Sequence, residues 1–492
     1  GGAGMGAPDG GPQRTAGGST PIALAVATLL KNMIGAGIFS LPRGLLRATP
    51  VAGMGILAFV GALSAGSYWM IGYCCITWNV RSFRDLWYCI FGKGTAWIID
   101  TTIFLNGWFT LVCYVVLIGD FTTKSFGGFL GQDHFLARNR AFSQWFTAVA
   151  VLLPLSLARD LSKLAFTSML GLCVLLYAVL MVIRDSVLHS PQEWGPDVVM
   201  FEWRMGAFEA IALNTHAFVA HYNAPKLFSE LYRPSYRRWL AVVVLAYGTA
   251  FSVYSVFSYM GLRRFEGAVR GNILRNYGPD VAVLAAWLGM GFSIAFTYPL
   301  VFNSTREAAV NLFVAAREVS KSMPSIQLSQ KKPWDARGTS QRAAIRQRSP
   351  SEVNMLGELS EDDDHPMPHK PGRRATVLLV FLTMIVGTMC EDVGIVNALA
   401  GSMMGVMICL VLPGLLFLST ARLQLQRVTG NSLAKPFLRG HSPAGTSLPA
   451  VPHGQRGRLA LRLAVVAGAV TAVVGVIVSI IGTIVILASH SS

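Results

Sequence analysis

Charged residues are scarce in this chain. Asp, Glu, Lys and Arg make up 13% of its 492 residues, whereas soluble globular chains carry about 25%. Hydrophobic residues make up 53%, and several apolar runs exceed about 18 residues, the length at which a helix crosses a bilayer. The lack of charge therefore excludes a soluble globular protein and predicts an integral multi-pass membrane protein embedded in the lipid bilayer.

Motifs for metal clusters, disulfides and covalent catalysis are missing as well. The seven cysteines lie in or beside apolar runs without zinc or redox spacing, so we interpret them as small packing residues. No nucleophile–base pair stands out, which argues against an enzyme, and no cofactor is expected. The net charge is +16, but the basic residues occupy short loops and polar segments without interleaved aromatics. Nucleic acid is therefore not an expected partner.

The apolar runs predict an all-α protein with eleven transmembrane helices. The expected helices cover 21–46, 52–78, 94–123, 144–158, 164–185, 205–231, 238–261, 281–315, 375–390, 393–420 and 461–488. Three polar segments interrupt this pattern. They are a disordered cytoplasmic tail at 1–20, a disordered cytoplasmic insert at 316–373 and a cytoplasmic linker at 421–460. The membrane part accordingly divides into 21–315 with the binding site, 374–420 and 461–489.

The distribution of basic residues predicts the orientation. Lys and Arg are more abundant in the segments on the same side as the N-terminus, and basic loops remain on the cytoplasmic side. We therefore expect a cytoplasmic N-terminus, in either the plasma membrane or a vacuolar or lysosomal membrane. Asp120, at the outer end of the third helix, is expected to be solvated.

The first apolar helix contains a predicted break. Gly35 and Gly37 lie near its middle, three and five residues after Asn32, and glycine weakens a helix. Backbone that leaves the helix inside a membrane is tolerated only beside protein or a water-filled cavity. A helix interrupted at the midplane indicates a transporter binding site. The alternative is a close-packing face, but that pattern prefers a spacing of four.

The sixth helix is too polar to face lipid. Its polar residues are Glu209, Asn214, Thr215, His216, His221, Tyr222 and Asn223. We expect this helix to face a cavity or the bundle interior. The first and sixth helices lie five helices apart, which is the layout of two five-helix repeats of inverted topology, each opening with a discontinuous helix. The eleventh helix is then an extra one.

Four motifs resemble a known family. Lys-Asn-Met-Ile-Gly-Ala-Gly-Ile-Phe-Ser-Leu-Pro at 31–42 resembles the first-helix signature of the amino acid/auxin permease family. The segments 153–168, Phe-Val-Ala-His-Tyr-Asn-Ala-Pro-Lys at 218–226 and Thr-Tyr-Pro-Leu at 297–300 are similar to its other signatures. The chain looks close to the system A and N neutral amino acid transporters and the vacuolar amino acid transporters. The resemblance implies a LeuT-like fold and secondary transport of amino acids.

The substrate site is expected where the broken helices meet. An α-carboxylate requires backbone N–H groups at a helix N-terminus, which the stretch from Met33 to Ile38 can supply. An α-ammonium requires carbonyls, which an unwound stretch near Asn214–Ala220 can supply, and the substrate side chain would contact the third and sixth helices. The predicted substrate-binding residues are Asn32, Met33, Gly35, Ala36, Gly37, Ile38, Tyr114, Asn214, Thr215 and Phe218.

Two coupling ions remain open. Na⁺ would bind between the first and eighth helices, at carbonyls near Asn32 and Ile34 and at the hydroxyl of Thr297; the resemblance implies such an Asn and Thr. Protons would instead be carried on the sixth helix, by Glu209, His216 and His221. Sodium is slightly favoured. Thr297 can alternatively bond within its own helix, and a structural role for His221 is favoured over proton transfer.

Two other functions compete with transport. A channel requires rings of charge or carbonyls along a pore, and no repeated filter-like segment is present. A membrane amino acid sensor would bind the substrate and signal through the insert 316–373, which would recruit a regulatory partner. Transport that saturates at low turnover separates a transporter from a channel, and binding without any transport would favour the sensor.

Overall fold

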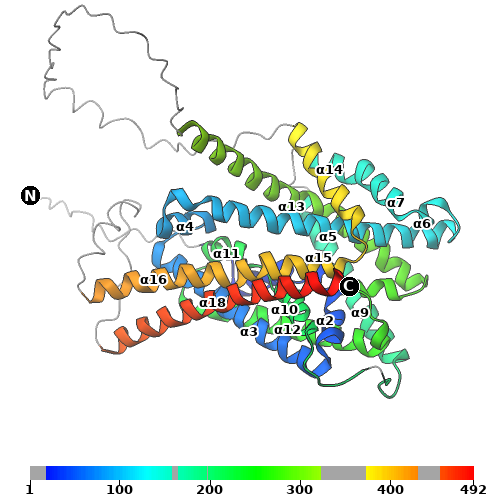
Figure 1. Ribbon diagram of the computed structural model, residues 1–492, viewed down its shortest axis with the longest axis horizontal. Helices are drawn as coiled ribbons and strands as arrows, with labels where there is room; N and C mark the ends of the chain where they lie inside the picture. Colours follow the sequence, from blue (N-terminus) through cyan, green and yellow to red (C-terminus); the bar gives the residue numbers. More distant parts are fainter. Residues whose placement is uncertain (1–17, 158–163, 197, 323–372, 430–454, 492) are drawn as a thin grey trace, which may run out of the picture.

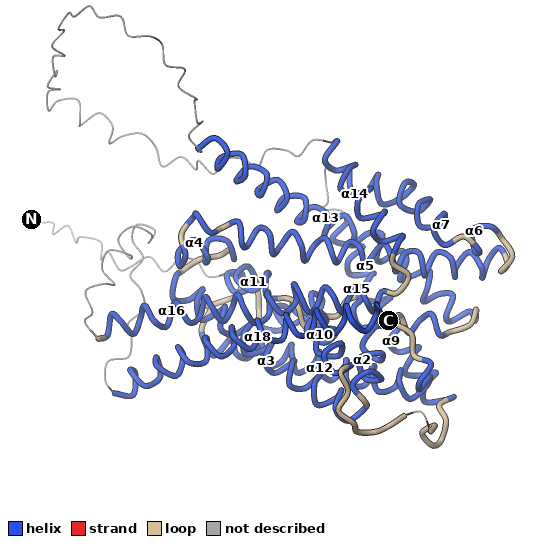
Figure 2. Tube along the Cα trace, in the orientation of Figure 1, coloured by secondary structure: helices blue, strands red, loops and turns tan. Residues whose placement is uncertain are grey.

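The computed structural model describes residues 18–157, 164–196, 198–322, 373–429 and 455–491. These residues form a bundle of helices joined by loops (Figures 1 and 2). Within the described ranges, extended pairing is limited to an isolated parallel bridge between Thr20 and Leu231. The cytoplasmic tail predicted at 1–20 and the insert predicted at 316–373 fall largely outside these ranges, as does much of the linker predicted at 421–460.

The helices follow the predicted spans closely. Their bounds are α1 Ile22–Met33, η1 Ala36–Ser40, α2 Leu41–Ala48, α3 Pro50–Trp78, α4 Phe83–Phe91, η2 Lys93–Thr95, α5 Trp97–Leu130, α6 Phe135–Arg138, α7 Arg140–Thr147, η3 Ala148–Leu152, α8 Leu153–Leu157, α9 Leu164–His189, α10 Gly206–Ala217, η4 His221–Asn223, α11 Ala224–Glu230, α12 Tyr236–Phe265, η5 Glu266–Ala268, η6 Ile273–Asn276, α13 Val281–Ser322, α14 Arg373–Met389, α15 Val393–Ala400, η8 Gly401–Gly405, η9 Met407–Val411, α16 Leu412–Val428 and α18 Gln455–Ser491.

The structure differs from the predicted bounds mainly in helix length. Helix α5 continues to Leu130, α13 to Ser322 and α16 to Val428, so α13 enters the range assigned to the insert and α16 that assigned to the linker. The polar stretch after α3 forms the additional helix α4, whose N-cap residue Ser82 accepts a hydrogen bond from the Asp85 N–H. A serine cap stabilises a helix start that apolar periodicity alone does not reveal.

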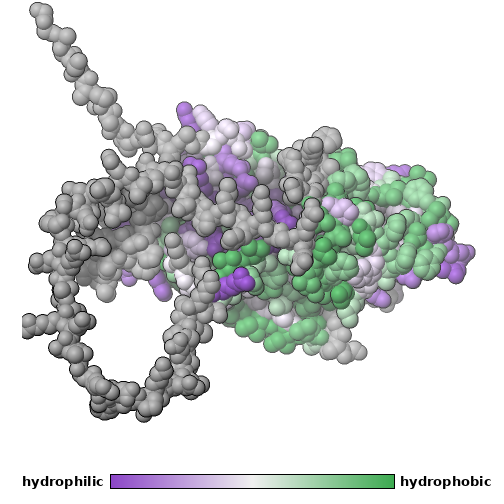
Figure 3. Space-filling view, turned by 90° about the horizontal axis from the view of Figure 1, so that it is seen from above, coloured by the Kyte–Doolittle hydropathy of each residue, from purple (hydrophilic) through white to green (hydrophobic). Residues whose placement is uncertain are grey.

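Eight helical segments of the described chain are long and apolar enough to cross a membrane, or nine if the bent pair α1 and α2 counts as one span. The face shown in Figure 3 is hydrophobic over a broad area, with hydrophilic residues gathered toward its ends. Lipid offers no hydrogen-bond partners to the backbone, and a helix needs none because its N–H and carbonyl groups bond to each other. The described part of the chain is therefore that of a multi-pass membrane protein.

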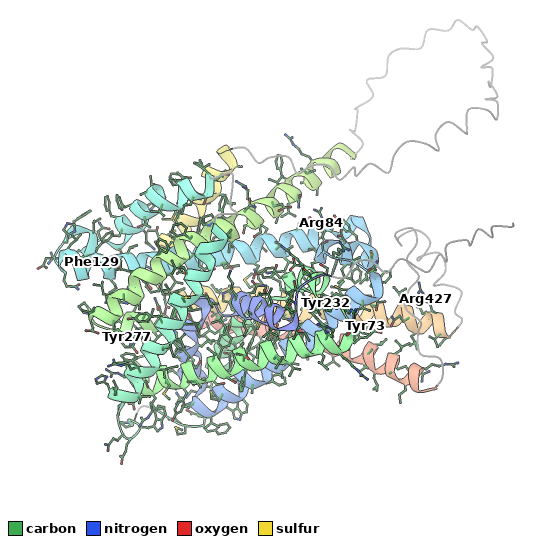
Figure 4. The ribbon with its side chains drawn as sticks, turned by 180° about the vertical axis from the view of Figure 1, so that it is seen from behind. Tyr73, Arg84, Phe129, Tyr232, Tyr277 and Arg427 are labelled. Carbon is green, nitrogen blue, oxygen red and sulfur yellow. The ribbon has the colours of Figure 1, made fainter. Side chains whose placement is uncertain are left out.

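Successive long helices run between two ends of the bundle. Figure 4 places Phe129 and Tyr277 at one end, and Arg84, Tyr232 and Arg427 at the other. We call these the Tyr277 end and the Arg84 end.

Three packing arrangements account for much of the contact between helices. Helix α13 lies along α5, and α12 packs on α1, α2 and α3. Helices α16 and α18 approach closely through Gly414 and Gly468, because a Cβ on either glycine would lie 2.7 Å from backbone nitrogen of the other helix. Small residues permit such contact between membrane helices.

Candidate functional site

The first predicted break is present in the structure. Helix α1 ends at Met33, Ile34 and Gly35 adopt extended backbone angles, and the chain resumes as the 3₁₀ turn η1. The two helical halves are bent by 53° relative to each other. The carbonyl end of α1 and the N–H end of the following half therefore face one region, and these ends carry opposite partial charges.

The second break lies at the end of the predicted stretch. Helix α10 ends at Ala217, and η4 follows after Phe218–Ala220. Asn214 and Thr215 remain helical and buried. The Asn214 carbonyl accepts the Phe218 N–H at 3.1 Å. That carbonyl is used within the helix end, so the unwound part is shorter than the predicted Asn214–Ala220.

One side chain joins the two breaks. The hydroxyl of Tyr254, on α12, lies 2.8 Å from the Met33 carbonyl oxygen and 2.9 Å from the Ala217 carbonyl oxygen. Its ring is fully buried and meets the Phe218 ring edge-on at 5.1 Å. Tyr254 is not among the site residues predicted from the sequence. The available signal was a pair of tyrosines, Tyr247 and Tyr254, two helical turns apart.

The predicted substrate residues at the first break differ in burial and in the free space beside them. Gly35 faces open space, since a Cβ there would meet no atom within 4 Å. A Cβ on Gly37 would lie 3.5 Å from the His216 ring. Met33 and Ile38 are buried, whereas Asn32 is partly exposed. The free space on this side of the bundle therefore lies beside Gly35.

Tyr114 and Phe218 occupy different surroundings. Tyr114, on α5, is partly buried at the edge of the hydrophobic core. Phe218 is fully buried and stacks on Tyr247 at 5.8 Å between ring centroids. In this conformation Phe218 therefore packs inside the bundle, and Tyr114 retains some exposed surface.

The predicted sodium ligands lie on two helices, α1 and α13, whose main packing partners differ. The Thr297 hydroxyl donates to the Ser293 carbonyl at 2.8 Å within α13. The Ile34 N–H donates to the Leu30 carbonyl at 2.7 Å. Helix α1 packs chiefly on α12, while α13 packs on α5 and α9. The Thr297 hydroxyl oxygen keeps its lone pairs while it donates this hydrogen bond, so the bond leaves a ligand role for Thr297 open.

His221 has a complete set of buried partners. Its Nε2 lies 3.0 Å from the Ser67 hydroxyl and 3.1 Å from the Ser64 carbonyl oxygen. Its Nδ1 lies 3.3 Å from the Cys409 sulfur. Because a carbonyl only accepts, Nε2 carries the hydrogen and Nδ1 accepts from the thiol. This arrangement joins α3, η4 and η9 around a neutral ring.

Glu209 is held by arginines. Its carboxylate lies 3.0 Å from Arg43 Nε and 3.2 Å from Arg47 Nε. Arg43 also pairs with Asp392, the residue that caps α15 through the Gly394 N–H. The Glu209 side chain is 4% exposed. These ion pairs connect α2, α10 and α15 across the gap between the first break and α15.

A second group of charges surrounds Asp120. The expectation that Asp120 is solvated is wrong: the residue is only 4% exposed. Its carboxylate lies 3.2 Å from Arg140 and accepts the Asn272 amide N–H at 3.1 Å. Arg275 stands 3.8 Å away. Tertiary contacts bury this carboxylate, because two other segments, α7 with Arg140 and η6 with its cap Asn272 and Arg275, supply its partners.

Both charge groups meet at the turn between α14 and α15. Arg140 donates to the Cys390 carbonyl at 3.3 Å, and Arg275 donates to the Glu391 carbonyl at 2.9 Å. Arg43 binds the next residue, Asp392. This turn borders a cavity of about 330 Å³ between α5, α14 and α15. Three arginines from separate elements therefore close this part of the bundle, near the Tyr277 end.

His216 differs from His221. The residue is partly exposed, and its Nδ1 is buried without a hydrogen-bond partner among the described residues. Gly37 lies on one side of it, and a Cβ on Gly401 would lie 3.1 Å from the His216 Cβ. Of the three predicted proton carriers, His216 therefore retains an unused polar atom beside the first break.

A buried polar chain also reaches the first break. The Asn397 amide donates to the Ser40 hydroxyl at 2.9 Å, and its oxygen accepts from the Cys113 thiol at 2.9 Å. All three residues are buried. Cys113 was predicted to be a packing residue, and Asn397 is not among the residues predicted from the sequence. Their contact spans 284 residues of sequence, which no local pattern encodes.

Most of the chain matches one known protein family. Residues 18–437 match the family described as transmembrane amino acid transporter protein. The chain belongs to this transmembrane amino acid transporter family. The match confirms the resemblance to the amino acid/auxin permease family. The family and its members found here are transporters and not enzymes.

Two curated relatives show the range of similarity. The putative sodium-coupled neutral amino acid transporter 11 of Danio rerio is 28% identical over 318 residues, which cover 62% of this chain and 69% of the relative. The sodium-coupled neutral amino acid transporter 7 of Mus musculus is 24% identical over 312 residues, covering 60% and 66%. The matched segment thus spans about two thirds of each relative's length.

A solved structure supports the fold of this family member. The nucleobase-cation-symport-1 family transporter Mhp1, in a closed conformation with bromovinylhydantoin bound, aligns with a TM-score of 0.52. The alignment covers 98% of this chain and 94% of Mhp1, at 12% sequence identity. The likeness extends to the fold alone and agrees with the LeuT-like architecture that the motifs implied.

Proposed function

We propose that this chain is a secondary active transporter that moves amino acids across a membrane by coupling to a cation gradient. The observation that carries the proposal is the meeting of two helix breaks, at Ile34–Gly35 and Phe218–Ala220, inside a bundle of this family. Discontinuous membrane helices present N–H and carbonyl groups to polar ligands. The sodium-coupled names of both relatives support cation coupling.

The amino acid would bind beside Gly35. Its α-carboxylate would accept hydrogen bonds from backbone N–H groups at the start of η1, where the helix dipole favours an anion. Its α-ammonium would meet carbonyls at Ala217–Ala220. The open space beside Gly35 supports this placement, and partly exposed Asn32 and Tyr114 are the side chains with free surface for the substrate.

Sodium is the favoured coupling ion. Two of the three candidate proton carriers already have partners, since Glu209 pairs with Arg43 and Arg47 and His221 bonds to Ser67 and Cys409. A proton-coupled mechanism would therefore rest on His216.

The proposed topology has eleven spans. Nine of these are the apolar segments that include the bent pair. The other two would be the broken helix formed by α10 and α11, and the short helix α14. Two inverted five-helix repeats would then begin at α1 and α10, with α18 as the extra helix. We propose that the Arg84 end is cytoplasmic, as the positive-inside rule predicts, with the N-terminus on the same side. The plasma membrane and a vacuolar or lysosomal membrane are both compatible with this topology.

The test is uptake of a panel of labelled amino acids into proteoliposomes under an imposed sodium or proton gradient. We expect sodium-driven uptake by the wild type. Thr297→Ala should weaken the sodium dependence, while Thr249→Ala serves as the matched control. The Thr249 hydroxyl also donates 2.8 Å to the carbonyl four residues earlier, but on an exposed face of α12.

Each outcome has a distinct meaning. Equal sodium dependence in both variants would remove Thr297 from the sodium site. Uptake driven only by protons would replace sodium and direct attention to His216. Saturable amino acid binding without any transport would favour the sensor, with the insert 316–373 as its signalling segment and a regulatory partner to be sought there.

A further inference from the structure

We propose that Tyr254 is a positioning residue that holds the two helix breaks in register and thereby sets the affinity for substrate and coupling cation. This inference rests on the proposed transport function. Its starting point is the position of the hydroxyl, 2.8 Å from the Met33 carbonyl oxygen and 2.9 Å from the Ala217 carbonyl oxygen.

The two carbonyls have a special position in their helices. Met33 and Ala217 are the last residues of α1 and α10. The final carbonyls of a helix lack partners within it and carry its negative partial charge. Two such carbonyls pointing at one place would repel each other unless a donor lay between them. Tyr254 supplies that donor from a third helix.

A single hydroxyl hydrogen serves both carbonyls. Tyrosine has one O–H hydrogen, so the two carbonyl oxygens share it or accept it in turn. If either helix end moves away, the hydrogen remains fully available to the other. The hydroxyl therefore links the breaks while allowing them to separate, as a change of conformation during transport would require.

The tyrosine ring is fixed firmly enough to set this geometry. Tyr254 is 0% exposed, and its ring meets Phe218 edge-on at 5.1 Å. Phe218 in turn stacks on Tyr247, with 17° between the ring planes. Helix α12 also packs on α1 and α2, the two halves on either side of the first break. The donor position is thus set by the core.

The consequence concerns the groups nearest the ligands. Backbone from Met33 to Gly35 and from Ala217 to Ala220 is the backbone we assign to the substrate and the cation. Removing the Tyr254 hydroxyl would leave two buried carbonyls without this donor and free both ends to shift. A displacement there changes the positions of ligand groups, and binding depends on such positioning.

The experiment compares Tyr254→Phe with Tyr298→Phe in the full chain. Tyr298 is also fully buried, and its hydroxyl lies 2.8 Å from the Thr383 hydroxyl, between α13 and α14. In proteoliposomes we would measure the KM for the amino acid and the cation concentration for half-maximal uptake. Equilibrium binding of the labelled amino acid and thermal unfolding in detergent would be measured on the same preparations.

We expect Tyr254→Phe to change the half-maximal cation concentration or the KM by about tenfold, the effect of losing roughly one hydrogen bond. Tyr298→Phe should lower thermal stability and leave both affinities at wild-type values. Wild-type affinities in Tyr254→Phe would overturn the proposal. So would equal changes of affinity in both variants, because the effect would then be one of general destabilisation.

The proposal can still be tested if Tyr254→Phe does not fold or if the protein does not transport amino acids. If Tyr254→Phe does not fold, 3-fluorotyrosine at position 254 provides a stronger hydroxyl donor of nearly the same shape, and unchanged affinities would then overturn the proposal. If the wild type binds an amino acid without transporting it, the transport function fails, while a tenfold change in binding affinity in Tyr254→Phe still supports the positioning role. Unchanged binding affinity would reject that role.

Discussion

The shared ion pairs of Arg43 provide the sharpest stability prediction. Arg43 contacts Glu209 at 3.0 Å and also pairs with Asp392, and its side chain is 13% exposed. The perturbation is the set Glu209→Gln, Asp392→Asn and the double variant. Each single change removes one negative partner, whereas the double change leaves Arg43 without either carboxylate.

The magnitudes follow from this sharing. In each single variant the new amide still accepts a hydrogen bond and Arg43 keeps its other carboxylate, so each should lose only about 0.5–1.5 kcal/mol, the net contribution of one ordinary hydrogen bond. An uncompensated buried charge costs more, about 3–5 kcal/mol. We therefore expect the double variant to lose about 1–3 kcal/mol more than the sum of the singles. Loss of the Arg47–Glu209 pair should add little to these costs. The Arg47 side chain is 42% exposed, so water solvates its charge when Glu209 is replaced.

The assay is unfolding of the four proteins in mixed micelles by titration with a denaturing detergent. Asp133→Asn is the control, since the Arg138–Asp133 pair has side chains 68% and 91% exposed and such pairs contribute about 0–1 kcal/mol. Losses that add to within about 0.5 kcal/mol would refute the argument, because they would show that Glu209 and Asp392 act independently.

Two further predictions concern packing and the buried histidine. Gly401→Ala should lower the melting temperature, because the new Cβ would lie 1.9 Å from the Ala212 carbonyl oxygen. The control Gly35→Ala, whose Cβ would meet open space, should unfold at the wild-type temperature. Equal melting temperatures for the two variants would contradict this prediction. His221→Phe should lower the free energy of unfolding by about 1–3 kcal/mol, because the Cys409 thiol and the other partners of His221 lose their hydrogen bonds. The ratio of proton-driven to sodium-driven uptake should stay constant. Selective loss of proton-driven uptake would instead make His221 a proton carrier.

Much of the fold was predictable because membrane helices are determined locally. A run of about 20 apolar residues crosses a bilayer as a helix whatever its neighbours are, and the observed bounds follow the predicted spans. The first break was predictable for a similar reason. Gly35 and Gly37 weaken the helix at their own positions, and the chain leaves the helix at Ile34–Gly35.

The candidate site was only partly predictable. The polar sequence around His216 and His221 indicated an interior helix, but it left open whether His221 carries protons or holds the structure. The contact with Cys409 bears on that question, and it lies 188 residues away in sequence. Thr297 likewise matches the sodium pattern by type and position, and its hydroxyl hydrogen is used within α13, so its role as a sodium ligand stays a prediction.

The sequence by itself determined which segments enter the membrane and where the first of them breaks, because apolar length and glycine act through the backbone of a single segment. Only the tertiary structure decided how the buried polar groups are paired. Asp120 is the clearest case, since the sequence predicted it at a solvated helix end, whereas α5 continues to Leu130 and Arg140, Asn272 and Arg275 surround the buried carboxylate. Tyr254 is the counterpart at the breaks. Its role depends on two carbonyls from other helices, and the free energy of such a contact depends on distances in space that residue order does not specify.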